Sequence, residues 1–509
     1  MKSILSSRNQ FSGNKTAVSH LILLAGTLLV GFSMGRWLAP LAAWIGPVLF
    51  LRYAREHKVG RGFLLVFAAY ILAFLIGFGA MWAASWGIVM MATLAVTYGL
   101  LWSLPILADR LLSPNLRGFS ATLVFPLAAT TFEFLNIHSN PVGIWGATGF
   151  TQFGILPLMQ LASVTGMIGI TFMMGWFASV VNWSWENRDS GGEIVRGVGV
   201  FATVLALVFI SGYVRLNLAP LNETSGTVRV AGITAEPARE MGQRFDELPD
   251  PDLNSPAARQ MIEAHWERYF SETVREAQAG ATVVLWPETA GGGTASTEDA
   301  HVTRAQEVAR ENGIYLAIPL WTMPDDPNSE ELLVNKLLVI DPTGSIVIDH
   351  VKYGGQIFEG GYRVQGEKIV QTVDTPFGRL SGLICWDMDY PTVVQQAGLS
   401  GTGLMLVPSS DWLEIDPIHA YMNVYAAIEN GMSLVRQTEG GLSIVYDAYG
   451  RVLAQTDFFG ATDRTMIAQV PVKHVPTLYT AFGRWFEWLC LAGFLIVVAR
   501  ALTLRRLVK

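Results

Sequence analysis

Residues 379–391, RLSGLICWDMDYP, place Cys385, one of only two cysteines in the chain, at the end of an apolar run. The run predicts a short buried strand, because about four to eight apolar residues before an abrupt break are typical of core strands. A sulfur at such a strand end is held rigidly, and a helix beginning next would favour its thiolate through free N–H groups. Cys385 is therefore a candidate nucleophile, with a small buried hydrophobe as the alternative.

The composition divides the chain into membrane-like and soluble parts. Hydrophobic residues make up 51% of the 509 residues and charged residues only 15%, which is too apolar for an ordinary soluble protein. Long uncharged runs lie within 19–214 and 484–499, whereas 215–475 has a soluble composition. The net charge of −7 gives no reason to expect a nucleic-acid partner. Both cysteines are expected to be free thiols, because one lies in each kind of segment.

Several apolar runs are long enough to cross a membrane, which takes about 20 mostly apolar residues. The candidate runs are 19–36, 37–51, 62–82, 86–108, 118–135, 155–181, 196–214 and 481–500, of which the second is short. They predict a transmembrane domain at 19–214 with about seven helices and a C-terminal transmembrane helix at 481–500. No cleavage pattern follows the first run, so we expect it to be a retained span.

The distribution of Lys and Arg predicts the orientation in the membrane. These residues occur in the tails 1–18 and 501–509, in the loop 52–61 and at Arg110, Arg117 and Arg188, but not in 83–85 or 136–154. Arg36, between the first two runs, is the one exception. Because basic loops remain in the cytoplasm, both tails are expected there and the soluble domain on the extracytoplasmic side. Eight spans fit this alternation better than seven, since seven would place one basic tail outside.

Two features near the outer ends of the predicted spans have open interpretations. Glu133 is either functional or paired, as acids within a membrane usually are, or a solvated helix end. The loop 138–154, HSNPVGIWGATGFTQFG, is rich in glycine and aromatic residues. It either lines an interfacial pocket for lipid tails or, through Trp145 and Phe150, contributes to an aromatic belt.

From residue 227 the chain alternates strand-like and helix-like segments, which predicts layered α/β structure. Buried strands are expected in VRVAGITA, ATVVLWPE, IYLAIPLW, RLSGLICW and GLMLVPSS, and helices at 256–278, 300–312 and 418–431. The stretch NKLLVIDPTGSIVIDHVKY, 335–353, predicts a hairpin with Asp-Pro-Thr-Gly as its turn.

Three reactive side chains, Glu288, Lys352 and Cys385, each follow a predicted strand. A thiol nucleophile needs a base for its proton and a donor for the developing oxyanion. A carboxylate in a partly dry pocket acts as base and then as acid, and an ammonium stabilises the oxyanion and the thiolate. Together they would catalyse acyl transfer without histidine. Separately, Glu288 has the alternative of a loop carboxylate and Lys352 that of an exposed strand end.

Neighbouring residues offer further candidates with ordinary alternatives. His350 shares a strand face with the lysine, but we expect an exposed histidine there. Asp387 either tunes the cysteine or caps a following helix. Trp386 either gates the pocket or packs, and Asp411 either shapes an acyl site or belongs to a turn at a strand end.

The order of WPE, HVKYGGQIFEGG and GLICWDMDYP resembles the nitrilase, or carbon–nitrogen hydrolase, superfamily. This resemblance implies an αββα sandwich with a Glu, Lys, Cys triad, carried over to Glu288, Lys352 and Cys385. The spans before and after the domain, with GFTQFGILPLMQLASVTGMIGIT, resemble the narrower apolipoprotein N-acyltransferase family. The expected fold is a multi-span α-helical membrane domain plus an α/β nitrilase-like αββα sandwich.

The resemblance also implies a reaction. Cys385 would take an acyl chain from a phospholipid as a thioester and pass it to the N-terminal amine of a diacylglyceryl-cysteine lipoprotein. Glu288 would be the general base and acid, Lys352 the oxyanion donor, and Glu359 a second carboxylate that positions them. No metal or organic cofactor is implied. The partners would be phospholipid and lipoprotein, and the location a bacterial inner membrane.

Departures from the family pattern keep other functions open. Trp386-Asp387 stands where the family usually has Tyr-Glu, and Gly232–Ala235 where it usually has Gln-Gly-Asn. These changes spare the triad but alter its surroundings, so the acceptor could be another amine. A membrane-anchored nitrilase-like amidase or hydrolase is the second hypothesis. A catalytically silent scaffold or transporter is the third, and it predicts that the three triad residues lie apart.

Overall fold

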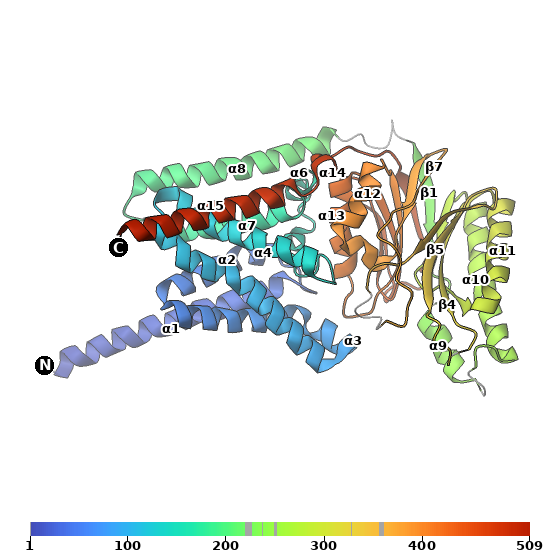
Figure 1. Cartoon of the computed structure of the whole chain (residues 1–509), viewed down its shortest axis with the longest axis horizontal. Helices are drawn as coiled ribbons and strands as arrows, with labels where there is room; N and C mark the ends of the chain where they lie inside the picture. Colours follow the sequence, from blue (N-terminus) through green and yellow to red (C-terminus); the bar gives the residue numbers. More distant parts are fainter. Residues whose placement is uncertain are drawn as a thin grey trace. The chain divides into compact units, whose positions relative to one another are not determined.

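The computed structural model describes residues 2–218, 226–236, 238–248, 252–326, 328–355 and 361–508. The chain forms two compact units, shown in Figure 1. We call the first the helical unit; it comprises Met1–His138, Gly146–Val214 and Arg484–Lys509. We call the second the sandwich unit; it comprises Ser139–Trp145 and Arg215–Gly483.

The helical unit consists of long apolar helices and short helical turns. Its longer helices are α1 (Lys2–Ser33), α2 (Pro40–Glu56), α3 (Val59–Leu112), α4 (Val124–Ser139), α7 (Ile168–Glu186), α8 (Gly191–Leu218) and α15 (Trp485–Val508). Helix α3 is two helices in sequence, because Gly87 has φ 76° and ψ 172°, which interrupts the helical path. The sequence predicts this break just before Gly87, between the runs 62–82 and 86–108.

Six helices among the described residues are long and apolar enough to cross a membrane. A seventh span results if Leu156–Thr165 and Ile168–Glu186, bent by 115°, are taken together. Helix α2, with 17 residues, lies at the lower limit of about 17 residues for a span. The count of eight spans therefore stays a prediction.

One predicted element is wrong. The run 155–181 is not a continuous helix but is divided into α5 (Leu156–Met159), α6 (Ala162–Thr165) and α7. Gly166 follows α6 with φ 73° and ψ 170°, a conformation that glycine adopts without the steric cost of a side chain. Apolar composition alone gave no sign of this turn.

Glu133 lies inside the helical unit and is not a solvated helix end. Its side chain is 6% exposed and accepts three hydrogen bonds. Thr171 Oγ1 donates to Oε1 at 2.7 Å, while Thr148 donates to Oε2 through N at 3.0 Å and through Oγ1 at 2.9 Å. A buried carboxylate needs such donors, so Glu133 joins α4 to α7 and to the loop before η3 (Gly149–Gln152).

The sandwich unit contains two sheets. One has the order β13-β1-β2-β4-β5-β6, with β3 paired to β4, and the other the order β12-β11-β10-β9-β8-β7. The strands of the first are β1 (Thr227–Gly232), β2 (Val283–Leu285), β3 (Gly291–Thr294), β4 (Tyr315–Met323), β5 (Val334–Ile340), β6 (Ile346–Val351) and β13 (Met466–Pro471). Those of the second are β7 (Thr372–Thr375), β8 (Gly378–Gly382), β9 (Leu404–Ser410), β10 (Ser433–Glu439), β11 (Leu442–Tyr446) and β12 (Val452–Asp457).

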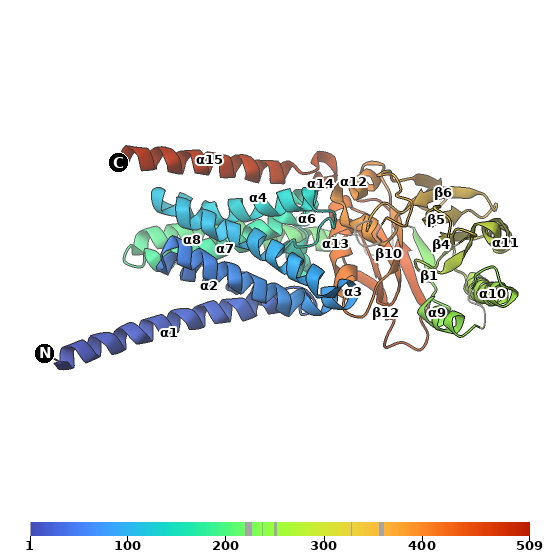
Figure 2. The ribbon, with the colours of Figure 1, turned by 60° about the horizontal axis from the view of Figure 1, so that its bottom comes forward.

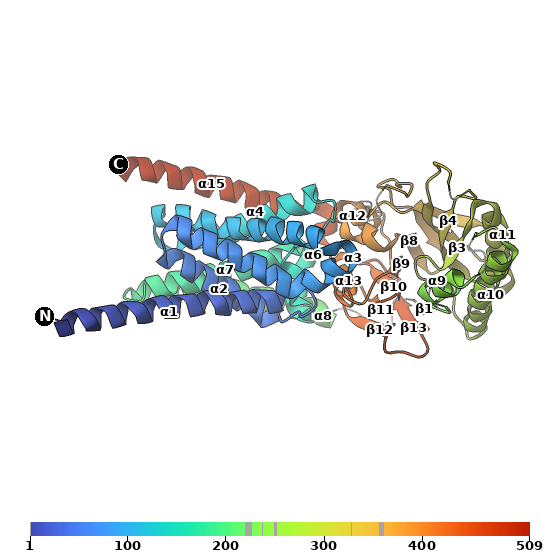
Figure 3. The same cartoon turned by 90° about the horizontal axis from the view of Figure 1, so that it is seen from below.

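Helices cover the outer faces of both sheets, as Figures 2 and 3 show. Helices α9 (Ala238–Asp246), α10 (Pro256–Gln278) and α11 (Ala295–Asn312) belong to the first sheet, while α12 (Pro391–Leu399) and α13 (Ile418–Asn430) belong to the second. Trp266 and Tyr269 of α10 pack in one buried cluster with Trp286, which follows β2. The sandwich unit is an αββα sandwich and the other unit is helical, so the predicted fold class is confirmed.

Candidate active site

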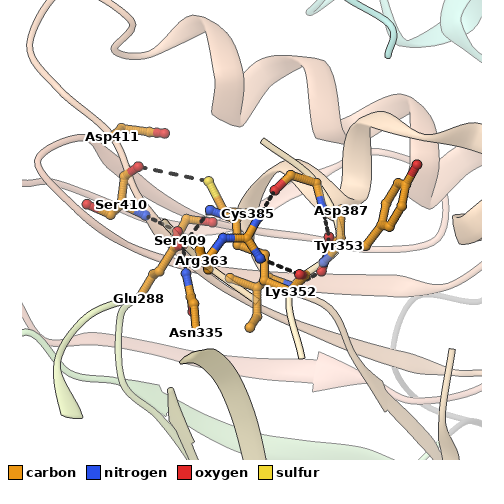
Figure 4. Close-up of polar contacts among 12 residues, drawn as sticks. Glu288, Asn335, Lys352, Tyr353, Arg363, Cys385, Asp387, Ser409, Ser410 and Asp411 are labelled. Carbon is orange, nitrogen blue, oxygen red and sulfur yellow. Dashed lines mark hydrogen bonds and ion pairs between the residues drawn. The ribbon is translucent and has the colours of Figure 1, made fainter. Parts of the chain in front are cut away.

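The three predicted catalytic residues follow strands of the two sheets. Glu288 comes after β2, and Lys352 comes directly after β6 of the same sheet. Cys385 comes after β8 of the other sheet and begins the 3₁₀ turn η4 (Cys385–Asp389). Glu288 N donates to Ser409 O of β9 at 3.2 Å, so the three side chains meet between the sheets (Figure 4).

Glu288 and Lys352 form a buried ion pair. Lys352 Nζ lies 2.7 Å from Glu288 Oε1, and the residues are 3% and 2% exposed respectively. Asn335 Nδ2 donates to the same oxygen at 2.8 Å, and Ser410 N donates to Oε2 at 3.1 Å. These donors hold the carboxylate in one orientation and offset part of the cost of burying both charges.

Cys385 lies against this pair in a strained backbone conformation. Its φ of 46° is in the left-handed region, which is unfavourable for residues other than glycine and recurs at functional sites. The thiol contacts Ser410 O at 3.9 Å, so Ser410 touches both the sulfur and, through its N–H, the Glu288 carboxylate. The geometry brings the predicted triad together, contrary to the expectation of the scaffold hypothesis.

The charges around Cys385 act on its thiol in opposite directions. Burial raises the pKa of Cys385 above its ordinary value, and the negative charge of Glu288 raises it further. Lys352 and His419 lower it. The net effect is a raised pKa, so the resting sulfur is favoured as a thiol.

Asp387 joins the segment after Lys352 to the turn that carries Cys385. Its Oδ1 accepts from Tyr353 N at 3.0 Å and from Gly354 N at 2.6 Å, and its Oδ2 accepts from Ile384 N at 3.0 Å. The last of these bonds caps the N-terminus of η4, the turn to which Asp387 itself belongs, and not that of a following helix. Asp387 also joins the segment after Lys352 to the turn that carries Cys385.

His350 was expected to be an exposed strand residue, and this prediction is wrong. It is 4% exposed, and its Nε2 lies 2.7 Å from Asp387 Oδ2. The alternation of β6 points its side chain to the same side as Lys352, toward the other sheet. A histidine at this position therefore completes the hydrogen bonding of Asp387.

The remaining predicted site residues have different outcomes. Trp386 is 5% exposed and its ring packs near those of Trp145 and His419, with centroids 5.9 Å away in each case. It therefore packs rather than gates. Glu359 lies outside the described residues.

A second group of buried charges lies beside the cysteine, and of its members sequence reasoning named only Asp411. His419 of α13 lies between Asp411, whose Oδ1 is 3.0 Å from Nδ1, and Asp389, whose Oδ2 is 3.1 Å from Nε2. Arg436 of β10 contacts both oxygens of Asp411, at 2.9 and 3.0 Å. The only sequence signal was the occurrence of charged residues within apolar elements.

The loop 139–145 contributes a tryptophan to this group. Trp145 is 1% exposed, and its Nε1 donates to Asp389 Oδ2 at 2.8 Å. Ile144 N also donates to Asp389 O at 3.0 Å, and Gly143 allows this approach with φ 64°. Trp145 is therefore a buried hydrogen-bond donor, and the aromatic-belt interpretation does not apply to it.

One set of side chains has the composition of a metal site. Among the described residues, Cys385, Asp411 and His419 are the group of such ligands whose atoms all lie within 4.8 Å of one another. Both ring nitrogens of His419 already face carboxylates, whereas a metal requires a lone pair on one of them. The donor set therefore fits hydrogen bonding better than a metal ion.

Comparisons with known proteins match both units. The carbon–nitrogen hydrolase family model matches residues 253–478, and the model of the apolipoprotein N-acyltransferase N-terminal domain matches 25–180. An apolipoprotein N-acyltransferase of Geobacter metallireducens is 24% identical over 76% of this chain and 75% of its own length. That of Chlorobaculum tepidum is 24% identical over 94% and 96%. An amidase from Nesterenkonia sp. matches with 22% identity and a TM-score of 0.40, over 52% of this chain and 97% of its own.

Proposed function

Since this chain belongs to the apolipoprotein N-acyltransferase family, we propose that it transfers a phospholipid acyl chain to the N-terminal amine of a lipoprotein. The observation that carries the proposal is the buried Glu288–Lys352 pair beside the Cys385 thiol. This arrangement supplies a nucleophile, a base and an oxyanion donor in one place.

The first half of the reaction forms a thioester. Cys385 Sγ attacks the ester carbonyl carbon of the phospholipid, and its proton passes to the Glu288 carboxylate. The ammonium of Lys352 stabilises the tetrahedral oxyanion. When the carbon–oxygen bond breaks, Glu288 returns the proton to the departing lysophospholipid oxygen, so the base becomes the acid.

The second half of the reaction forms an amide. The free amine of the acceptor attacks the thioester carbon and gives a proton to Glu288, and the thiolate of Cys385 leaves. A thiolate leaves more readily than an alkoxide, so the acyl-enzyme is reactive toward an amine. The proton on Glu288 returns to the sulfur, and the cycle is complete without a cofactor.

The same residues would also hydrolyse an amide or ester if water replaced the amine. The match of 25–180 to the acyltransferase N-terminal domain favours transfer, because a hydrolase has no need for that membrane domain. Trp386-Asp387 stands next to Cys385 where the family usually has Tyr-Glu. The type of acceptor amine is therefore to be determined by experiment.

The proposed location is a bacterial inner membrane. The basic tails 1–18 and 501–509 support a cytoplasmic position for both termini. The sandwich unit would then face the extracytoplasmic side, where a lipoprotein presents its N-terminus. Fusion of a reporter that is active on only one side of the membrane to residue 509 tests this orientation.

The decisive experiment is to trap the thioester. The purified full-length chain is incubated with a phospholipid of one defined acyl composition, and intact-protein mass is measured. We expect the mass of one acyl group, lost on treatment with hydroxylamine and absent in Cys385→Ala.

The second cysteine provides a matched control. Cys490 is a buried free thiol of α15, and Cys490→Ala is expected to form the adduct like the unsubstituted chain. An adduct that persists in Cys385→Ala, or no adduct with any phospholipid, would contradict the proposal. Release of free fatty acid in place of acylated peptide amine would favour the hydrolase.

A further inference from the structure

His419 occupies a position that the triad chemistry does not explain. It is 0% exposed, on helix α13 beneath the turn that carries Cys385. One of its ring nitrogens, the Cys385 sulfur and an Asp411 oxygen all lie within 4.8 Å of one another. The sulfur thus has a histidine nearby in addition to the predicted base.

The hydrogen bonding of His419 requires a proton on each ring nitrogen. Asp411 Oδ1 lies 3.0 Å from Nδ1, and Asp389 Oδ2 lies 3.1 Å from Nε2. Carboxylate oxygens only accept, so a neutral ring would direct a lone pair at one of them. Arg436 Nη2 is also 3.0 Å from Nδ1 and contacts both oxygens of Asp411, so the Nε2 contact with Asp389 and the Nδ1 contact with Asp411 are what favour the doubly protonated ring.

The surrounding charges also favour the doubly protonated, positively charged state of His419. Burial alone would lower the pKa of His419, but the charge of Asp389 and that of Asp411 raise it well above the ordinary value, against the opposing effect of Arg436. Both the hydrogen bond and the positive charge of His419 lower the pKa of Cys385. A charged His419 therefore favours the thiolate.

Charged groups on several elements surround Cys385. The anions are Glu288 after β2, Asp411 after β9, and Asp387 and Asp389 of η4, with Asp387 paired to His350 of β6. The cations are Lys352 after β6, Arg363, which donates to Lys352 O, Arg436 of β10 and His419 of α13. Glu288 raises the pKa of Cys385, whereas Lys352 and His419 lower it, so a charged His419 offsets part of the cost of a thiolate in this buried place.

We propose that His419 is a positioning residue of the acyl transfer. It is a permanently charged imidazolium that stabilises the Cys385 thiolate, while Glu288 and Lys352 act as base and oxyanion donor. The positive charge of His419 is stabilised by Asp389 and Asp411, which also fix the orientation of its ring. Arg436 in turn binds Asp411. The proposal adds a second cation to the proposed triad. It concerns the ionisation of the sulfur, so it stands apart from the identity of the acyl donor and acceptor.

The test measures thiol ionisation without an acyl substrate. Cys490→Ala serves as the background, so that iodoacetamide reports only on Cys385 in the full-length, detergent-solubilised chain. Alkylation rates are measured across pH for this background and for His419→Gln. We expect His419→Gln to react about tenfold more slowly at pH values below the thiol pKa, since an adjacent opposite charge shifts a pKa by about one unit or more. At high pH the rates should converge.

Two outcomes would overturn the proposal. Superimposed pH profiles would mean that His419 carries no charge that the sulfur experiences. A reduction that is equal at all pH values would mean a change in access to the thiol. His301→Gln is the control, because His301 is also buried and paired with a glutamate, Glu263, but belongs to α11 of the other sheet.

If His419→Gln does not fold, Asp389→Asn replaces it. The near-isosteric change removes one negative charge near the sulfur, while Asp411 still holds the imidazolium. We then expect alkylation at neutral pH to become faster, the opposite direction to His419→Gln. A slower or unchanged rate would show that His419 had lost its proton with one partner removed, and the fixed-cation assignment would be wrong.

Discussion

Lys352 Nζ lies 2.7 Å from Glu288 Oε1, and this contact joins positions 64 residues apart in the sequence. Both side chains are buried. A pair of this kind contributes less to stability than its distance suggests, because each ion loses its hydration. In the proposed reaction, the pair would place the base and the oxyanion donor beside the thiol.

Removal of only one partner of this pair should be costly. Lys352→Met leaves the Glu288 carboxylate buried without its cation, and we expect a loss of about 3–5 kcal/mol in the free energy of unfolding. Adding Glu288→Gln should restore part of that loss, since no charge then remains unpaired. Thermal unfolding followed by tryptophan fluorescence checks both. A double variant less stable than Lys352→Met would count against a strongly coupled pair.

Asp387→Asn should destabilise the sandwich unit by about 3 kcal/mol, because an amide group cannot accept all the hydrogen bonds of a buried carboxylate. Burial raises the pKa of Asp387, but His350 and backbone N–H groups lower it below its ordinary value of 3.8. A depressed carboxyl pKa gives stability that is present above the unfolded value and lost as the pH falls through the folded value.

The pH dependence of the difference between Asp387→Asn and the unsubstituted chain follows from this sign. The gap in melting temperature should be constant from about pH 8 to pH 5 and should close only below 3.8. A gap that closed near neutral pH would instead report the ionisation of a histidine.

The close approach of Gly354 to the cysteine turn gives a further prediction. A Cβ at this position would lie 2.6 Å from Trp386 C and 2.9 Å from Asp387 N. Gly354→Ala must therefore push the two segments apart and break the bond from Gly354 N to Asp387. We expect at least tenfold slower thioester formation by mass spectrometry, because small displacements of catalytic groups are costly. Gly242→Ala, where a Cβ meets open space, should leave the rate unchanged.

The core strands were predictable because parallel strands buried on both faces are continuous apolar runs. Thus ATVVLWPE and GLMLVPSS contain β2 and β9. Strands β3, GGGT, and β7, TVDT, were not predicted. Their sequences lack apolar runs, and β3 pairs with β4, from which it is separated by the whole of α11.

The triad could be inferred because each member follows a recognisable strand, whereas its surroundings could not. His350 and Asp387 are 37 residues apart, and nothing local indicates that they pair. Likewise, the burial of His419 follows from the packing of α13 on the second sheet. Long-range contacts between polar groups leave no periodic pattern in a single sequence.

The hydroxyl of Thr171 should matter mainly through Glu133, although it also accepts a hydrogen bond from Thr148 Oγ1 at 3.1 Å. Thr171→Val keeps the shape but removes the donor to Oε1, and we expect a loss of about 1–3 kcal/mol in unfolding free energy. In a Glu133→Ala background the same change should cost much less, which a double-variant cycle of melting temperatures measures. Thr93→Val is the control, because Thr93 is exposed and donates only to Val89 O of its own helix. Equal costs in both backgrounds would mean that Thr171 acts through packing alone.

Trp145→Phe should loosen the support of Asp389 more than its size suggests. The change keeps a ring near Trp386 but removes the indole N–H that donates to Asp389 Oδ2 at 2.8 Å. A hydrogen bond to a buried charge contributes about 1.5–3 kcal/mol, and we expect a loss of that size in thermal unfolding. The Asp389 carboxylate would then depend on His419 and Asn423, whose Nδ2 is 3.5 Å from Oδ1.

Trp185→Phe, at a tryptophan that is 59% exposed, is the control and should change stability by less than about 0.5 kcal/mol. If Trp145→Phe were equally harmless, the indole bond would not fix Asp389, and the charge that the aspartate holds beneath Cys385 would need another anchor.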